Sequence, residues 1–116
     1  MNISLASLFA DIPRNLPEEL CQTLLENPSV RIERIVSQGH SSPAEGWYDQ
    51  EQTEWVLLLQ GQARLSFAEA DPVDLNPGDY LLIPAHCRHR VDWTSSDPAC
   101  IWLAIHIFSD CPSAGA

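Results

Sequence analysis

From residue 30 onward the chain is a series of short segments in which apolar and polar residues alternate. This pattern predicts strands over residues 30–36, 47–50, 54–59, 63–67, 80–83, 88–93 and 100–108. Residues rich in Gly, Asn, Asp and Pro form the turns between them. Seven or eight short strands without an internal repeat are typical of an all-β sandwich or barrel.

The first 29 residues follow a different pattern. Apolar residues recur there at helical spacing, at Leu16, Leu20, Cys21 and Leu24. Pro17 suits the first position of a helix, and the residue before Pro28 is restricted, which ends it. The sequence therefore predicts a short helix over residues 17–26. We expect an N-terminal helical segment at residues 1–29, a barrel at residues 30–109 and a disordered tail at residues 110–116.

In the predicted strand 54–59, both faces carry apolar residues, although only one face can lie against the core. Trp55, Leu57 and Leu59 therefore need another cover, which is the N-terminal helix, a second sheet layer or a second subunit. A helix of about three turns is too short to cover a sheet face. A symmetric homodimer is the commonest way to bury such a patch, so we expect one.

Composition and charge narrow the range of functions. The chain has 116 residues, 45% of them hydrophobic and 19% charged, which suits one folded domain. Six basic residues, all Arg, stand against 16 acidic ones, which gives a net charge of −10. Nucleic-acid binding and binding to an anionic membrane surface both need a basic face, so neither is expected.

Location and redox state are predicted from what the sequence lacks. No apolar run approaches the ~20 residues that span a bilayer, and no basic residue precedes the apolar N-terminus as in a signal peptide. The four cysteines are Cys21, Cys87, Cys100 and Cys111, and none forms a C-x-x-C pair. We therefore expect reduced thiols and a cytoplasmic location.

Two segments resemble the paired motifs of the cupin superfamily in its small single-domain form. In the first, Glu54 and Gly61 are separated by six residues; in the second, Gly78 is followed by Pro84 and then by His89. The resemblance covers roughly residues 31–108. It implies an antiparallel, jelly-roll-like β-barrel, preceded here by the short N-terminal helix, with a ligand or metal cavity inside.

The first motif departs from the pattern of metal-binding cupins, which place two histidines shortly before the glutamate. Those places hold Tyr48 and Gln50, or Trp47 and Asp49. Glu54 and His89 match the ligand positions directly, and Asp49 and His86 are candidates for further ligands. Such an oxygen-rich set favours a weakly held Mn²⁺, Fe²⁺ or Zn²⁺. Tyr48, Gln50 and His106 are expected to line the pocket.

Each of these residues also has a purely structural interpretation. His89 would then bond to Tyr48 or Glu54 in an empty barrel, His86 would cap a turn, and His106 would be a satisfied core histidine. Glu54, if it faces inward, must be paired or coordinated, because an unpaired buried carboxylate costs several kcal/mol. An exposed turn residue is the alternative for Glu54.

Three classes of function remain open. The first is the binding of a small polar or anionic molecule, with a divalent metal and dioxygenase, isomerase or decarboxylase chemistry. The second is a metal-free, non-catalytic binding or sensor module, and a structural dimer without a ligand is a third. Strand alternation leaves Arg31 or Arg34 as the only cavity cation, so a sugar diphosphate should not bind tightly without a metal.

Overall fold

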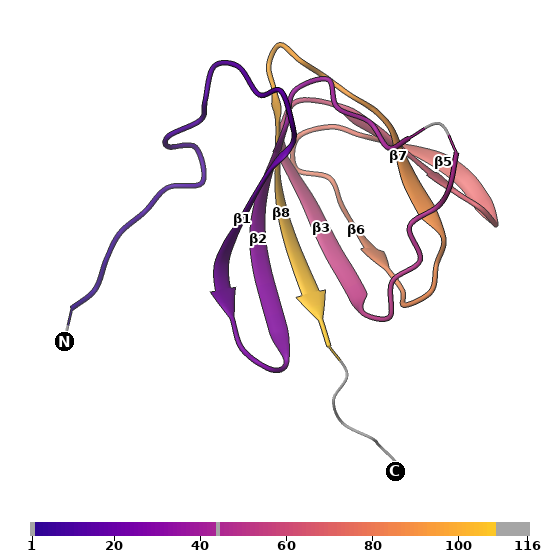
Figure 1. Cartoon of the computed structure of the whole chain (residues 1–116), viewed down its shortest axis with the longest axis horizontal. Helices are drawn as coiled ribbons and strands as arrows, with labels where there is room; N and C mark the ends of the chain where they lie inside the picture. The colour runs from indigo at the N-terminus through magenta and orange to yellow at the C-terminus, as the bar shows by residue number, and fades with distance from the viewer. Residues whose placement is uncertain (1, 44, 109–116) are drawn as a thin grey trace.

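The computed structural model describes residues 2–43 and 45–108, which form antiparallel β-strands (Figure 1). In chain order the strands are β1 Leu20–Glu26, β2 Val30–Ser37, β3 Thr53–Gln60, β4 Ala63–Phe67, β5 Ala70–Leu75, β6 Tyr80–Ile83, β7 His89–Thr94 and β8 Cys100–Ile107. Within these described ranges no helix has the length and apolar character needed to cross a membrane.

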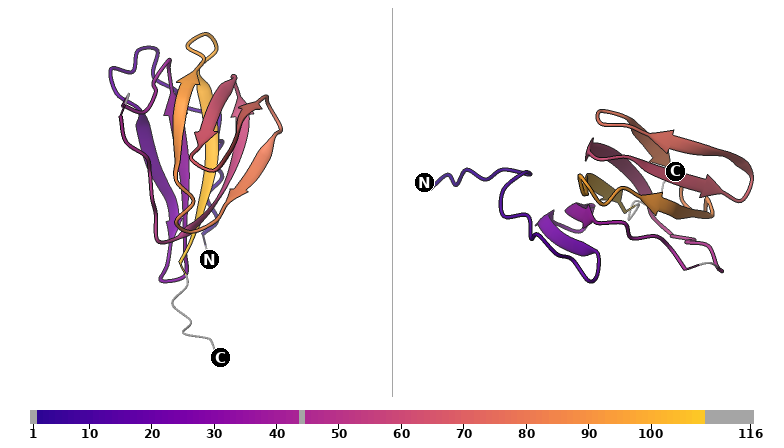
Figure 2. Two further views of the ribbon diagram at one scale, coloured as in Figure 1. Left: turned by 90° about the vertical axis from the view of Figure 1, so that its right-hand side faces the viewer. Right: turned by 90° about the horizontal axis from the view of Figure 1, so that it is seen from above.

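The strands form two sheets that face one another. The larger sheet has the order β1-β2-β8-β3-β6 and the smaller one the order β5-β4-β7. Figure 2 shows them as two layers, with the N-terminal residues extending away on the β1 side. The sheets are not closed into a barrel by a continuous ladder, which corrects the predicted closed barrel: β1 and β6 end one sheet, and β5 and β7 end the other. The all-β, antiparallel class is confirmed.

The core lies between the layers and consists of the inward-facing apolar side chains of both sheets. Its members are Val56, Leu58, Ala63, Leu65, Leu75, Ile83, Cys100 and Trp102. The central strand β8 pairs with β2 from Val30↔Ile107 to Ser37↔Cys100, and on its other side it pairs with β3. Because β8 pairs along its length with both neighbours, the inward-facing side chains of β2, β8 and β3 lie side by side on one face of the sheet.

The predicted N-terminal helix is wrong. Residues Leu20–Glu26 form the edge strand β1, which pairs with β2 from Leu20↔Val36 to Glu26↔Arg31. The Asn27 side chain accepts hydrogen bonds from the backbone nitrogens of Ser29 and Val30, so this segment is a hairpin turn rather than a helix end. The free edge of β2 offers a full ladder of backbone partners, and this outweighs the weak helical spacing of three leucines.

Two differences in the predicted strands have clear physical causes. Residues 47–50 contribute only an isolated bridge between Tyr48 and His89. Strand β5 was not predicted, because it contains Pro72, which cannot donate to a ladder. Since β5 lies at the edge of its sheet, the missing donor can face outward there.

Some predictions are not tested by this structure. The tail at residues 110–116, with Cys111, lies outside the described residues. The boundaries at residues 1–29 and 30–109 also stay predictions. The thiols of Cys21, Cys87 and Cys100 are free.

Candidate ligand cavity

An open cavity of about 660 Å³ lies between the two sheets. Its lining includes Tyr48, Gln50, Glu54, His89 and His106, all of which the sequence placed in the pocket or its metal site. The walls between the polar groups are formed by apolar side chains of both sheets, including Trp102, Val56 and Leu65. The volume is in the range of sites that bind small molecules.

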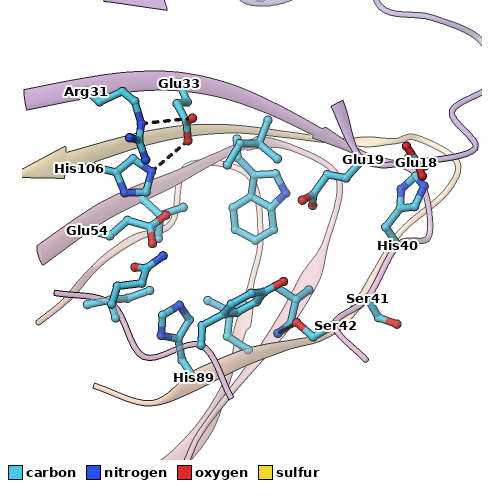
Figure 3. A pocket seen from close by; sticks show the side chains of 18 of the residues that line it. Glu18, Glu19, Arg31, Glu33, His40, Ser41, Ser42, Glu54, His89 and His106 are labelled. Carbon is cyan, nitrogen blue, oxygen red and sulfur yellow. Dashed lines mark hydrogen bonds and ion pairs between the residues drawn. The ribbon is translucent and has the colours of Figure 1, made fainter. Parts of the chain in front are cut away.

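A row of polar side chains crosses the inner face of the larger sheet. Arg31 of β2 lies opposite His106 of β8, which in turn lies opposite Glu54 of β3. Glu33, two residues after Arg31 on the same face, contacts both neighbours: His106 Nε2 lies 3.0 Å from its Oε1, and Arg31 Nε lies 3.4 Å from its Oε2 (Figure 3). Strand alternation therefore gathers four ionisable groups on the inner face of this sheet.

The partners of His106 define its tautomer. The amide nitrogen of Gln52 lies 3.3 Å from Nδ1 and can only donate, so Nδ1 is the acceptor. Nε2 then carries the ring proton and donates it to Glu33. Both nitrogens of this buried ring are thereby engaged within the protein.

Glu54 differs from its neighbours in the row. The residue is 9% exposed, yet its carboxyl group forms no hydrogen bond with any residue of the described ranges 2–43 and 45–108. Burial raises the pKa of the Glu54 carboxyl, and the imidazoles of His106 and His89 only partly oppose this rise. Glu54 is thus an unpartnered carboxyl group in the wall of a cavity.

His89 faces Glu54 from the opposite sheet (Figure 3). Its Nδ1 lies 2.9 Å from the carbonyl oxygen of Cys87 and donates to it, which leaves the lone pair of Nε2 available in the neutral ring. The ring of Tyr48, 5.7 Å away, and that of Phe67, 6.4 Å away, hold the imidazole in place. The residue is 6% exposed.

The other two predicted metal ligands lie elsewhere. Asp49 and His86 do not line the cavity; they form a pair with each other, at 2.8 Å, on the protein surface. The φ angle of His86 is 62°, in the region that favours glycine, and its backbone nitrogen donates to the carbonyl oxygen of Gln50. This geometry fits the turn interpretation of His86.

The residues present do not fit a metal ion. Of the four predicted ligands only Glu54 and His89 reach the cavity, and the nearby His106 uses both ring nitrogens in the protein. Among residues 2–43 and 45–108, no group of three or more His, Cys, Asp or Glu side chains has an arrangement suited to holding one. Protein metal sites typically need at least three such ligands.

Several lining residues were not identified as site residues from the sequence. Glu33 belongs to them, together with a polar group at the cavity mouth that comprises Glu18, Glu19, His40, Ser41 and Ser42. Glu19 is held by the hydroxyl of buried Ser37, which donates to Oε2 at 2.6 Å. Glu33 could have been identified from the sequence, because alternation in β2 places it on the same face as Arg31. The mouth residues carry no such signal, because they come from segments without regular strands.

Comparisons with known proteins show which family and which solved structures the chain resembles. Residues 33–106 match the family model of the cupin domain. A structure from Ralstonia eutropha JMP134, described as a candidate mannose-6-phosphate isomerase, is 44% identical, covers 92% of this chain and 100% of its own, and has a TM-score of 0.88. A cupin superfamily protein from Desulfitobacterium hafniense DCB-2 is 22% identical, with a TM-score of 0.75 and coverage of 94% and 95%. No protein among the curated sequences matches.

Proposed function

The chain belongs to the cupin family, as its two motifs predicted, and we propose that its cavity binds a small polar molecule through Glu54 without a metal. The observation that carries this proposal is the carboxyl group of Glu54, which is largely buried, lines the open cavity and has no hydrogen-bond partner among the described residues. Burial penalises the charged form of this carboxyl group and raises its pKa. A ligand that donates hydrogen bonds to Glu54 would offset part of this penalty.

The proposal replaces the weakly held Mn²⁺, Fe²⁺ or Zn²⁺ that the family resemblance implied. Asp49 and His86 are occupied with each other at the surface, so the cavity lacks a third ligand. The cavity retains a carboxyl group and an imidazole with a free lone pair, on opposite walls. These two groups can bind a ligand by hydrogen bonds alone.

A second candidate function is isomerisation by proton transfer. The raised pKa of Glu54 brings this carboxyl group closer to neutral pH, where a carboxylate is a more effective general base. Glu54 would remove the proton from the hydroxyl-bearing carbon next to the carbonyl group and return it to the carbonyl carbon. His89 Nε2 would accept the proton of the hydroxyl group and deliver it to the carbonyl oxygen. The description of the 44% identical protein as a candidate isomerase supports this reaction class.

Calorimetric titration in a buffer that contains a chelator tests the binding proposal. Glu54→Gln keeps the shape of the side chain but removes its charge, and it should weaken ligand binding at least tenfold. Glu69→Gln, at an exposed position between β4 and β5, makes the same charge change and should leave binding unchanged. Binding that is lost on adding chelator would contradict the proposal.

Solvent deuterium exchange tests the isomerase candidate. Small hydroxy-carbonyl compounds are incubated with protein in deuterated, chelator-containing buffer, and incorporation at carbon is followed by proton NMR. Deuterium incorporation should be lost in Glu54→Gln and should be unchanged in Glu69→Gln. Binding without exchange would leave the non-catalytic binding module as the function.

We also propose that the protein forms a homodimer through the outer face of the larger sheet. This face carries Trp55 and Leu57 of β3, and it extends over Tyr80 and Leu82 of β6, which are 65% and 57% exposed. For a chain of net charge −10, an apolar face is where two copies can approach with least repulsion. The free thiols of Cys21, Cys87 and Cys100 support a cytoplasmic location as a further proposal.

A further inference from the structure

Two groups on opposite walls of the cavity are free to accept hydrogen bonds. The carboxyl group of Glu54 has no partner within the described residues. His89 donates its ring proton from Nδ1 to the carbonyl oxygen of Cys87, so Nε2 of the neutral ring presents a lone pair. A ligand that satisfies both groups must bring donors.

The arginines near the cavity are paired with other residues. Among the described residues Arg31 is the arginine that lines it; its Nε lies 3.4 Å from Oε2 of Glu33 without a hydrogen bond, and its guanidinium lies 5.4 Å from the centroid of the Phe108 ring. His106 donates to Glu33. Arg34, the other arginine considered as a cavity cation, binds the carbonyl oxygens of Leu8 and Ala10 and does not line the cavity.

The charges of the lining favour a cation. Four glutamates, namely Glu18, Glu19, Glu33 and Glu54, stand against the single arginine. In a partly enclosed site such an excess of carboxylates repels phosphate and carboxylate ligands and concentrates cations. Trp102 and Tyr48 also line the cavity, and aromatic rings are good surfaces for ammonium groups.

We propose that the ligand of this cavity is an organic amine, bound as its ammonium form, whose N–H groups donate to Glu54 and to Nε2 of His89. This inference rests on the proposed function and names its ligand class. Of the small polar or anionic molecules expected from the sequence, it excludes the anionic ones. It also departs from a sugar phosphate, the substrate class in the description of the R. eutropha protein.

Ligands with one skeleton and different charges provide the test. Glucosamine, glucose and glucose 6-phosphate form one set, and 1,4-diaminobutane, 1,4-butanediol and succinate form another. Binding to the full chain is measured by calorimetry and by thermal shift at pH 7 with chelator present. In at least one set the amine should bind at least tenfold more tightly than the neutral compound, and the anion should not bind.

One variant connects this preference to the site. Glu54→Gln should abolish the advantage of the amine. Glu69→Gln is the control for a change of net charge, and the melting temperature of each variant reports that it is folded. A preference that Glu54→Gln leaves intact would overturn the inference.

The outcomes separate the two proposals. If a neutral or anionic compound binds best in a Glu54-dependent way, the proposed function holds and the amine inference is wrong. If no amine produces binding or a thermal shift at 10 mM, the amine inference is wrong as well. If nothing in either set binds in a Glu54-dependent way, both are wrong.

Discussion

Beside Glu54, the inner face of the larger sheet carries ionisable side chains, whereas the outer face carries apolar ones. On the inner face Arg31, His106 and Glu54 lie side by side on β2, β8 and β3. One residue away along each strand, Ile32, Ile105 and Trp55 form the matching row on the outer face. This row continues to Leu25 at one edge and to Leu82 at the other.

In these two rows the usual pattern, in which a sheet buries apolar side chains and exposes polar ones, is reversed. Glu54 and His106 are 9% and 4% exposed, whereas Leu25 and Leu82 are 50% and 57% exposed. Neither face is stable as it stands, because buried charges need partners and large apolar patches favour contact with another surface. The comparison indicates a ligand on the inner face and a second copy of the chain on the outer face.

The largest expected effect concerns the outer face. Leu82→Glu should convert the proposed dimer to a monomer, since burying a carboxylate there costs several kcal/mol, or on the order of 100-fold in dissociation constant. Sedimentation at micromolar concentration measures the change. Val73→Glu, an exposed apolar position on β5 of the smaller sheet, should leave the dimer intact. A wild-type monomer of 12.9 kDa would contradict the dimer.

On the inner face, the His106–Glu33 hydrogen bond should be the most sensitive to substitution. His106→Leu removes the donor to a largely buried carboxylate and should lower the free energy of unfolding by about 2 kcal/mol. Urea denaturation measures the loss. The double variant with Glu33→Leu removes both partners and should lose less stability than the two single variants together. Losses that simply add would show that the pair is not coupled as described.

Glu54 should affect stability in the opposite direction. Its pKa is raised in the folded protein, so folding favours the neutral carboxyl group. The free energy of unfolding is therefore highest below the unfolded pKa of about 4.3, and it falls as pH rises through the folded pKa. Glu54→Gln should therefore stabilise the unliganded protein at pH 8, by about 1 kcal/mol, and less at pH 5. Denaturation at both values checks this, and a difference that shrinks toward pH 8 would contradict it.

The smallest effect is expected at the surface pair. Asp49→Asn removes the carboxylate that contacts the His86 ring. The side chains of Asp49 and His86 are 49% and 65% exposed, so stability should change by about 0.5 kcal/mol or less. Ligand binding, measured by the same titration as above, should be unchanged. A large loss of binding would show that Asp49 acts on the cavity after all.

The elements that the sequence predicted correctly are those whose pattern is local. Residues 54–59 and 100–108 are strongly apolar and rich in strand-forming residues, and both became central strands, β3 and β8. The motif positions Glu54 and His89 both line the cavity, from two different strands. Residues 17–26 carried only a weak helical spacing, and pairing with β2 decided their structure instead.

The sequence by itself determined an all-β chain of the cupin family, with the alternation that sends Glu54 to one face of its strand and Trp55 to the other. Only the tertiary structure decided which partners those side chains have. It brought Arg31, Glu33 and His106 beside Glu54, and it placed Asp49 and His86 at the surface. The reason is that alternation is a property of one strand, whereas the neighbours of a side chain depend on register between strands far apart in sequence.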